Sequence, residues 1–467
     1  MHMREPFSNF DAFLLHIETP TNLMVITGLI FFDQPIDIIL LKRIIQERLL
    51  NFERFQQRVI NTGLILKSPK WEFDPTFNIN AHVHNVGLPS PGDESALKDL
   101  VNDLMVVPMD MTKPLWQLYL VENYGEGSVL VARFHHALAD GLSLVNVFTS
   151  LGDDSANSHE SDTPASTRRK AASLMGRLIV PPLKLTNKML GLTKWTLLQG
   201  LEMIDNPDYF KDSLRDTTGN VLLLSKYMIG KSDPQTSLRG KCGIVKNGTW
   251  SAPIPLEQVK SLGKELGGTV NDVLLAAVTG GLRRYLEENG ETIDFLDIRA
   301  VVPVSVRNNG DLKDMGNQVG MVLMPLPVGQ QNPLNRYQIV KMRMDDLKQS
   351  GESNLIFNLL NTTIFKSKLL VTAMVGVITP KASLLVTNVP GQREQIAFAG
   401  RKIYHVIFWV PQTVGWGLGI SILSYAGEIT LGVAADASII TNPDQILEAI
   451  EAELGAMQEW AVNHTKL

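Results

Sequence analysis

Two adjacent histidines are the residues best suited to acid–base chemistry. His135 and His136 follow the strand-like segment 128–134 and open the sequence HHALADG, which leads into a predicted helix. Neighbouring side chains on an extended segment point to opposite faces, so the two rings cannot easily share a metal ion or a proton. One histidine therefore works alone. A neutral imidazole here could take a proton from a hydroxyl group, since its pKa lies near working pH. The alternative is a half-buried histidine pair beside Asp140, which would only cap the next helix.

Other common catalytic arrangements are missing from the sequence. The HExxH metal motif does not occur, and no further ligands for a zinc site lie near the histidine pair. Cys242 is the only cysteine, which excludes an intrachain disulfide and a cysteine-based zinc site. There is also no GxSxG motif for a serine nucleophile. We therefore predict no metal site.

Length and composition indicate a folded chain of more than one domain. The chain has 467 residues, of which 44% are hydrophobic and 19% charged, and its net charge is -5. This length suggests two or three domains, and the apolar balance is far from that of disordered proteins. A polar tract near residue 155 marks a boundary. We predict an N-terminal domain over 1–155, a linker over 156–235 and a C-terminal domain over 236–467.

Both predicted domains mix helix and strand patterns, which indicates an α/β fold. In the first, 25–32 and 128–134 have strand patterns and 36–50 has a helical one. In the second, a helix starts after Thr269, which stands in capping-box spacing with Asp272, and stops at Gly290. Strands are expected in LDIRAVVPVSV and in the hairpin that begins GLGISILSY, and a last helix runs from Thr441-Asn442-Pro443 to Trp460.

One apolar stretch could be mistaken for a membrane span. Residues 403–427 contain no Asp, Glu, Lys or Arg, but Pro411, Gln412 and four glycines interrupt them. Two strands of a buried sheet are the better interpretation. The N-terminus has no apolar run of the kind found in a secretory signal, so we expect a cytoplasmic protein.

The predicted linker contains a strongly basic segment. Residues 163–201 carry seven Lys or Arg side chains and no acidic one, so the rest of the chain has a net charge of -12. Leucines and other apolar residues alternate with the cations, a mixture suited to the surface of an anionic membrane or lipid droplet. The alternative is an ordinary linker whose apolar residues pack on the two domains.

Four motifs, taken in their order along the chain, resemble those of a known enzyme family. HHxxxDG at a strand end is typical of acyltransferases with the chloramphenicol acetyltransferase fold. Pro114-Leu115-Trp116 lies upstream, Asn271-Asp272 opens a helix, and Thr387-Asn388-Val389-Pro390-Gly391 lies late in the chain. Together with the regions 11–24 and 316–320, they are similar to the bifunctional wax ester synthase/diacylglycerol acyltransferase family over nearly the whole chain. Thr387 stands where serine is more usual, and the 163–201 segment is the least familiar part.

The resemblance implies a fold, a reaction and partners. The fold would be two chloramphenicol acetyltransferase-like domains, each a mixed sheet with helices, with the active site where they meet. His136 would deprotonate an acceptor alcohol, which attacks the acyl-CoA thioester without a covalent acyl-enzyme. Acyl-CoA and a fatty alcohol or diacylglycerol would be the substrates. No cofactor is needed, and no nucleic acid is expected as a partner.

The resemblance also implies roles for further residues. Asn271, near the positive end of its helix, could help to hold the oxyanion, although the Asn-Asp pair could simply cap the helix. A buried Asp140 needs a cation, for which Arg58 is the candidate and Arg307 the competitor. The other predicted supporting residues are His135 and Gly141. Substrate-channel positions are predicted at Pro114, Leu115, Trp116, Asn388, Pro390 and Gly391, with the last three in a turn that lets two elements cross.

Two other functions remain open at this point. A condensation domain of a peptide-assembly line shares the fold and HHxxxDG, but it condenses amines on carrier proteins, and no carrier domain adjoins this chain. A catalytically silent lipid-binding protein of a storage granule is the second, and the intact HHxxxDG argues against it.

Overall fold

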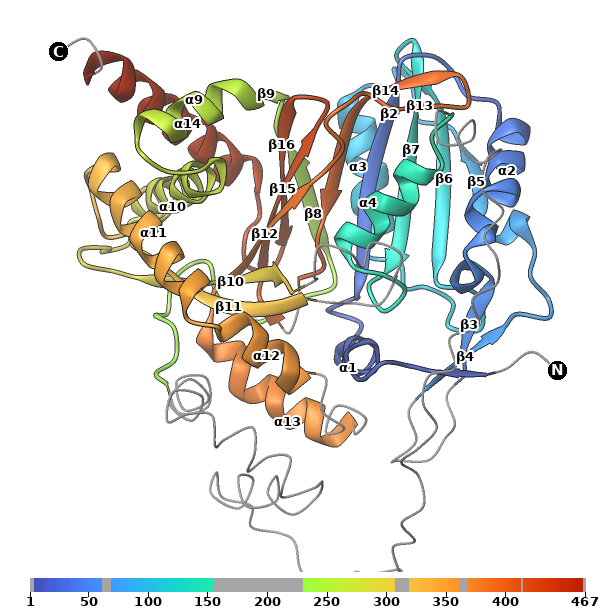
Figure 1. Cartoon of the computed structure of the whole chain (residues 1–467), viewed down its shortest axis with the longest axis horizontal. Helices are drawn as coiled ribbons and strands as arrows, with labels where there is room; N and C mark the ends of the chain where they lie inside the picture. Colours follow the sequence, from blue (N-terminus) through green and yellow to red (C-terminus); the bar gives the residue numbers. More distant parts are fainter. Residues whose placement is uncertain are drawn as a thin grey trace, which may run out of the picture.

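The chain folds into two large β-sheets that stand side by side and carry helices on their outer faces (Figure 1). The computed structural model describes residues 4–60, 69–153, 230–306, 319–360, 368–412 and 415–464. The basic segment 163–201, Arg307 and residues 316–318 lie outside these ranges. Strand β14, next to the short edge strand β13 of one sheet, packs against β15 and β16, which are interior strands of the other sheet.

The N-terminal sheet contains six strands among the described residues, in the order β13-β14-β2-β7-β6-β5. Their bounds are β2 (Val25–Phe32), β5 (Val83–Val86), β6 (Trp116–Tyr124), β7 (Gly127–His135), β13 (Ala397–Phe398) and β14 (Arg401–Trp409). Helices α2 (Ile38–Glu47), α3 (Glu94–Met105) and α4 (Gly141–Ser150) flank it. On β2, Ile30 packs in the core beneath α4, whereas the next residue, Phe31, packs in a separate core with Leu97 of α3. Alternation along the strand therefore supplies two apolar faces, one for each helix layer.

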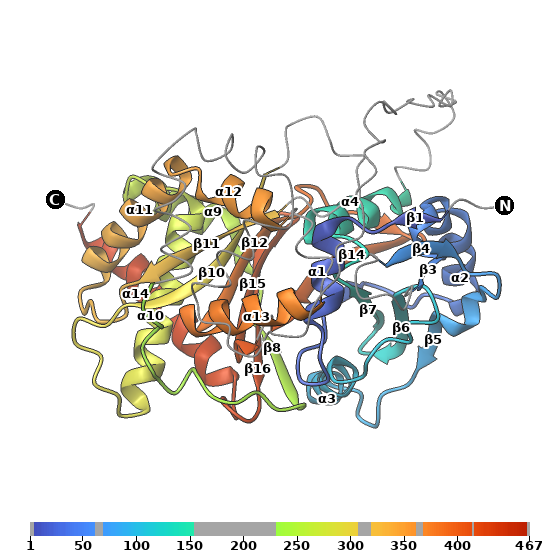
Figure 2. The ribbon, with the colours of Figure 1, turned by 90° about the horizontal axis from the view of Figure 1, so that it is seen from below.

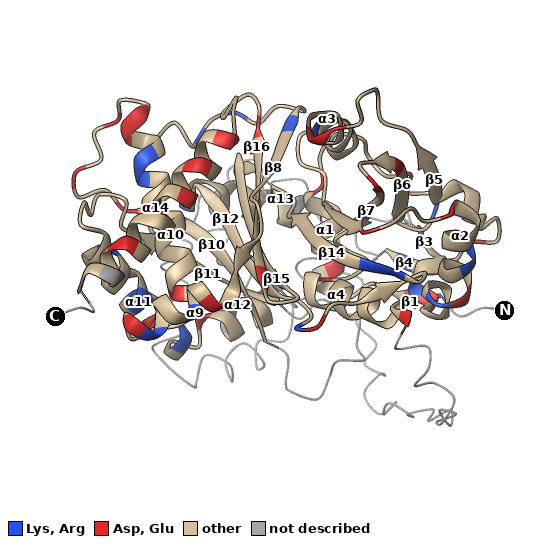
Figure 3. Cartoon of the chain, turned by 90° about the horizontal axis from the view of Figure 1, so that it is seen from above, with Lys and Arg blue, Asp and Glu red and all other residues tan. Residues whose placement is uncertain are grey.

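The C-terminal sheet has seven strands in the described part of the chain, in the order β11-β10-β12-β15-β16-β8, with β9 on β16. Their bounds are β8 (Lys246–Trp250), β9 (Ile254–Pro255), β10 (Ile298–Ser305), β11 (Val319–Leu326), β12 (Leu384–Pro390), β15 (Leu418–Tyr425) and β16 (Glu428–Asp436). The helices are α9 (Leu256–Glu265), α10 (Val270–Glu288), α11 (Pro333–Gln349), α12 (Glu352–Leu360), α13 (Lys368–Ile378) and α14 (Asp444–His464). Charged side chains are frequent on the outer helices α11 and α14 (Figure 3).

A small sheet and a short helix lie beside the N-terminal sheet. The sheet consists of β1 (Glu5–Pro6), β4 (Lys70–Phe73) and β3 (Gln57–Ile60), and the helix is α1 (Asn9–Ile17). Four 3-10 turns complete the described elements: η1 (Leu49–Asn51), η2 (Glu53–Gln56), η3 (Ile79–Ala81) and η6 (Thr379–Lys381). Helix α1 packs against α13, so residues 9–17 contact the C-terminal domain (Figure 2).

Helix α10 begins as its sequence predicts. The Thr269 hydroxyl accepts the N–H of Asp272 at 3.3 Å, and the Asp272 carboxylate accepts the N–H of Thr269 at 2.9 Å. Together these bonds form a complete capping box. Gly290 follows the helix with φ of +75°, a conformation that favours glycine and ends the helix.

The chain crosses between the domains late in the sequence. Strands β13 and β14 come from the C-terminal half but extend the N-terminal sheet, where β14 pairs with β2. Our division assigned all of 236–467 to the C-terminal domain, so the structure corrects it for 397–409. The pairing joins segments that are distant in sequence, such as Ile403 with Phe32 and Trp409 with Thr27, and a local pattern cannot reveal such contacts.

The apolar stretch 403–427 forms strands, as predicted. Strand β14 takes up its first part and belongs to the N-terminal sheet. Strand β15 takes up its last part and belongs to the C-terminal sheet. Among the described residues, no helix is both long enough and apolar enough to cross a membrane.

Candidate active site

His135 is fully buried and both of its ring nitrogens are hydrogen-bonded. Its Nε2 lies 2.8 Å from Glu18 Oε2, and its Nδ1 accepts the N–H of Ala137 at 3.0 Å. Because Nδ1 accepts, the ring proton sits on Nε2 and is donated to the carboxylate. The lone pair of His135 is thus already in use. This ring is placed to support structure and not to take a proton from a substrate.

His136 follows the last residue of β7, and its side chain is only partly buried. Its backbone N–H donates to the carbonyl of Met24 at 2.7 Å, which ties it to the start of β2. It lies in the turn after the strand, where its side chain is less buried than the His135 ring. Of the two histidines, His136 is therefore the one whose ring a substrate can reach.

Asp140 caps helix α4. Its side chain is 2% exposed, and Oδ1 accepts the N–H of Ser143 at 2.8 Å. Gly141 is the first residue of the helix. The capping role that the sequence left open for Asp140 is therefore present.

Arg58 is paired with Glu72 and not with Asp140, which contradicts our prediction. The two residues stand opposite each other on β3 and β4, and Arg58 Nη2 lies 3.3 Å from Glu72 Oε2. This pairing follows from the register of a sheet that the sequence did not reveal. The competing partner, Arg307, lies outside the described residues.

Asn271 is the second residue of α10 and contacts the Asn388 side chain. Asn388 Nδ2 donates to Asn271 Oδ1 at 3.1 Å, so the amide oxygen of Asn271 faces strand β12. The amide nitrogen of Asn271 makes no hydrogen bond within the described part of the chain and keeps two donors at the positive end of the helix. Such donors suit a developing oxyanion.

The motif that ends in Pro390-Gly391 is the end of a strand and not the turn that we predicted. Residues 387–390 belong to β12 and pair in parallel with Ser421–Ser424 of β15. Gly391 donates its N–H to the Ser424 carbonyl at 2.8 Å, and a Cβ at this position would collide with that oxygen. The glycine is needed for this close approach of two backbones.

Strand β12 and the segment after it lie along helix α4. A Cβ at Gly141 would lie 3.4 Å from Val389 Cγ2, and Gln392 Nε2 donates to Thr149 Oγ1 at 2.8 Å. Asn388, the neighbour of Val389, contacts Asn271. The fold thus brings HHxxxDG, the Asn-Asp helix start and the Asn388–Gly391 segment to one place between the domains.

Leu115 and Trp116 are core residues, which corrects their predicted place in a substrate channel. Both are fully buried, and Trp116 donates its ring N–H to the Phe55 carbonyl at 2.8 Å. The carbonyl of Leu115 accepts the N–H of His135 at 3.0 Å. Pro114 is also buried and forms a bridge with Arg58. The motif therefore supports the strand end that carries the histidines.

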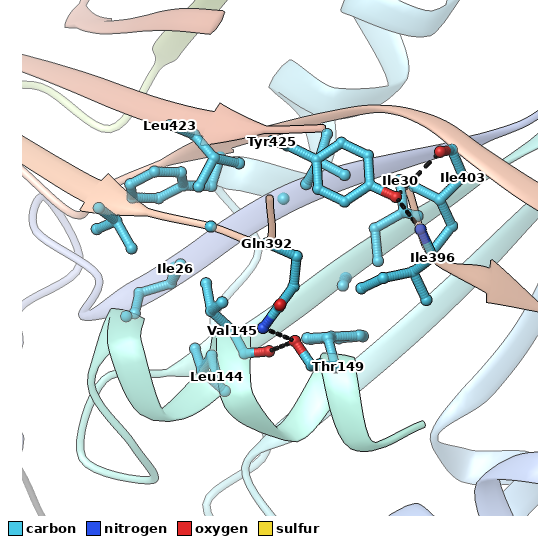
Figure 4. A pocket seen from close by; sticks show the side chains of 18 of the residues that line it. Ile26, Ile30, Leu144, Val145, Thr149, Gln392, Ile396, Ile403, Leu423 and Tyr425 are labelled. Atoms are coloured by element: carbon cyan, nitrogen blue, oxygen red, sulfur yellow. Dashed lines mark hydrogen bonds between the residues drawn. The ribbon is translucent and has the colours of Figure 1, made fainter. Parts of the chain in front are cut away.

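An apolar cavity of about 120 Å³ adjoins the histidine motif (Figure 4). Phe134, which precedes the motif, and Gly141, its last residue, both contribute to the cavity wall. The other walls come from α4, from β2 and β14 of the N-terminal sheet, and from Leu423 and Tyr425 of β15. The Tyr425 hydroxyl is turned aside, since it donates to the Ile403 carbonyl at 3.0 Å. The cavity suits a hydrocarbon chain and would reject phosphate or other charged groups.

Two family models match most of the chain. The wax ester synthase/diacylglycerol acyltransferase catalytic domain matches residues 7–274, and the C-terminal domain of the same family matches 315–458. The chain belongs to this family. As a member it is an O-acyltransferase enzyme, as the sequence predicted.

Relatives and solved structures agree with this assignment. A protein of Mycobacterium tuberculosis named a probable diacylglycerol O-acyltransferase is 29% identical over 414 residues, covering 87% of this chain and 84% of that protein. Wax ester synthase/diacylglycerol acyltransferase 2 of Arabidopsis thaliana is 26% identical over 452 residues, covering 89% and 88%.

The solved structures share the fold. The wax ester synthase/diacylglycerol acyltransferase of Marinobacter aquaeolei VT8 matches with a TM-score of 0.66 at 20% identity, covering 98% of this chain and 99% of that one. The first condensation domain of the calcium-dependent antibiotic synthetase matches with a TM-score of 0.63 at 14% identity, covering 98% and 96%. These likenesses confirm the predicted two-domain α/β fold, which condensation domains share.

Sequence reasoning missed one residue of this acyltransferase site, Glu18. It lies 117 positions before His135 and has no motif of its own. Burial raises the pKa of its carboxyl group, but hydrogen bonds from His135 and from the Met24 N–H outweigh burial and lower the pKa below its ordinary value. The only available signal was an acidic residue in the 11–24 region that contributed to the family resemblance.

The described part of this family member contains no cluster of side chains that could hold a metal ion. No three or more His, Cys, Asp or Glu side chains gather there closely enough to hold an ion.

Proposed function

We propose that this enzyme transfers a long acyl group from acyl-CoA to the hydroxyl of a fatty alcohol or of diacylglycerol, with His136 as the general base. The observation that carries the proposal is the division of labour in the histidine pair. His135 is buried and uses both ring nitrogens, whereas His136 is partly exposed beside an apolar cavity. The products are a wax ester or triacylglycerol.

The reaction needs only groups that the site and the substrates supply. The imidazole of His136 takes the hydroxyl proton while the alcohol oxygen bonds to the thioester carbonyl carbon. The carbonyl oxygen becomes an oxyanion, which the amide N–H groups of Asn271 stabilise. The C–S bond then breaks, and the departing CoA sulfur receives the proton from His136. Because the acyl group passes directly to the alcohol, the proposal requires no cofactor and no covalent intermediate.

The substrates differ in where they fit. An acyl or alkyl chain gains by leaving water for the apolar cavity beside Phe134 and Gly141. The phosphates of CoA gain nothing there and must stay outside it. We therefore propose that the cavity receives a hydrocarbon chain, with the reactive carbon held near the His136 ring.

Substitution of His136 tests the proposal. His136→Ala should lower kcat with acyl-CoA and hexadecanol or diacylglycerol by about 10²- to 10⁴-fold. His84→Ala, on β5 of the same sheet, is the matched control and should keep wild-type kcat. If folded His136→Ala protein kept more than about a tenth of wild-type activity, another group would have to be the base. Supplying hexadecanol and diacylglycerol in competition, followed by product analysis, would identify the preferred acceptor.

The same assay separates the two rival functions. A condensation-type enzyme would prefer an acyl carrier protein and an aminoacyl carrier over acyl-CoA and an alcohol. A silent lipid-binding protein would bind hexadecanol or diacylglycerol without turnover. Membership of the wax ester synthase/diacylglycerol acyltransferase family favours turnover with acyl-CoA.

We further propose that residues 163–201 attach the enzyme peripherally to an anionic membrane or lipid droplet. The support is the sequence alone, with seven cations among apolar residues, since this segment lies outside the described residues. Each basic side chain near an anionic surface contributes about 1 kcal/mol. Flotation with anionic vesicles should recover the wild type at low salt but less of a variant with Arg168, Arg169, Lys170 and Arg177 changed to Gln. Equal recovery of the two proteins, or recovery of neither, would refute the attachment.

A further inference from the structure

Glu18 makes two hydrogen bonds with a single carboxylate oxygen. Its Oε2 accepts the ring N–H of His135 at 2.8 Å and the backbone N–H of Met24 at 3.0 Å. The side chain is 14% exposed, so water competes little for this oxygen. Glu18 is the residue that follows helix α1, and its carboxylate joins the end of β7 to the start of β2.

Both partners of Glu18 are directly attached to His136. His135 precedes it in the chain, and the Met24 carbonyl accepts the His136 N–H at 2.7 Å. Glu18, His135, His136 and Met24 therefore form a closed ring of covalent and hydrogen bonds. The orientation of the His136 imidazole therefore depends on these four residues keeping their contacts.

Helix α1 connects Glu18 to the C-terminal domain. Glu18 is the C-cap residue of α1, and α1 packs on α13 of the other domain (Figure 2). The carboxylate is therefore fixed by the domain contact and not by the N-terminal sheet alone. A displaced α1 would pull Glu18 away from both of its donors.

We propose that Glu18 is a positioning residue for the acyl transfer, which acts through His135 and Met24 to orient His136. The inference rests on the proposed role of His136 as base. A shift of about 1 Å in a catalytic group can cost about 10²-fold in rate. Glu18 touches no reacting atom, so its loss should lower kcat and leave substrate binding almost unchanged.

The effect of the hydrogen bonds of Glu18 can be distinguished from the effect of its charge. One oxygen accepts both donors, and the amide oxygen of glutamine can do the same. The tautomer of His135 is fixed independently by the Ala137 N–H, so a glutamine must present its oxygen to Nε2. Glu18→Gln should therefore preserve the position of His136, whereas Glu18→Ala removes both hydrogen bonds.

The test compares kcat and KM of purified Glu18→Ala and Glu18→Gln with acyl-CoA and hexadecanol. Glu72→Ala, which removes an ion-paired carboxylate of the same domain, is the matched control. We expect Glu18→Ala to lose about 10²-fold in kcat with KM changed less than about threefold. Glu18→Gln should recover at least a third of wild-type kcat, and Glu72→Ala should match the wild type.

Several outcomes would overturn the inference. One is a kcat for Glu18→Ala within about threefold of wild type, and another is a loss explained by the unfolded fraction in circular dichroism. In the His136→Ala background, Glu18→Ala should cause no further loss, and an additional tenfold loss would mean that Glu18 acts by another route. Should His136→Ala alone keep more than a tenth of wild-type kcat, the proposed base fails first. That result is distinct from a failure of Glu18 alone.

Discussion

Asn388 donates a hydrogen bond of 3.1 Å to the side-chain oxygen of Asn271 and thereby orients an amide at the start of helix α10. The oxygen and nitrogen of one amide are different substituents of a planar carbon and point in different directions. Fixing the oxygen against β12 therefore points the two N–H donors of Asn271 elsewhere. Asp272 caps the helix, and we propose that the neighbouring Asn271 has a different function and offers its N–H donors to a substrate.

Replacement of Asn271 should show this difference. Asn271→Ala should lower kcat by about 10²- to 10³-fold, the cost of removing one oxyanion donor. Asn388→Ala should cost about fivefold, because it removes one neutral hydrogen bond of about 1 kcal/mol that only orients the amide. Steady-state kinetics with acyl-CoA and hexadecanol measures both losses. Asn289→Ala, at the far end of the same helix, is the control, and an equal loss there would exclude a role specific to Asn271.

The structure revises the expected partner of Arg58. In a double-mutant cycle, Arg58→Ala and Glu72→Ala should show a coupling of about 0.2–1 kcal/mol, as for other partly exposed ion pairs. Arg58→Ala and Asp140→Ala should instead be additive within about 0.5 kcal/mol. Urea unfolding of the single and double variants gives these free energies. A coupling above about 1 kcal/mol between Arg58 and Asp140 would restore the original prediction.

Local signals were sufficient where neighbouring residues determine the structure. Strand β2 has the predicted bounds because eight apolar or small residues form a buried strand without interruption. The start of α10 was predictable because its capping box lies within four consecutive residues. The histidine pair could be placed at a strand exit for the same reason.

Prediction failed where distant segments determine the contacts. Arg58 meets Glu72 only because β3 and β4 pair in one register, and a shift by one residue would turn Arg58 to the other face. Glu18 reaches His135 through the packing of α1, which no spacing in the sequence encodes. Trp116 was predicted in a substrate channel, but residues distant in sequence surround it and make it part of the core.

His405 on β14 should make stability sensitive to acid. Burial lowers the pKa of His405 to about 4, below its ordinary value of 6.5. Below pH 6.5 the unfolded chain takes up a proton that the folded chain does not bind, so stability falls as the pH drops from about 6.5 to 4. The whole effect is about 3 kcal/mol.

Urea unfolding at several pH values measures this loss. His405→Phe keeps a ring beside Phe31 but cannot take up a proton, so its stability should fall less than that of the wild type between pH 6.5 and 4. From pH 7 to 8 the two proteins should show the same pH dependence, which serves as the internal control. Parallel curves over the acidic range would show that His405 does not carry the effect.

Filling the apolar cavity should change the chain length that the enzyme accepts. Val145 lines the cavity from α4, and Val145→Phe adds a ring where we propose that a hydrocarbon chain lies (Figure 4). One methylene in an apolar site contributes about 1–3 kcal/mol to discrimination. The ratio of kcat/KM for hexadecanoyl-CoA to that for octanoyl-CoA should therefore fall at least about tenfold. Asn146→Phe, the next residue on α4, does not line the cavity and should leave this ratio unchanged. If Val145→Phe also left it unchanged while both proteins stayed folded, the acyl chain would have to bind elsewhere.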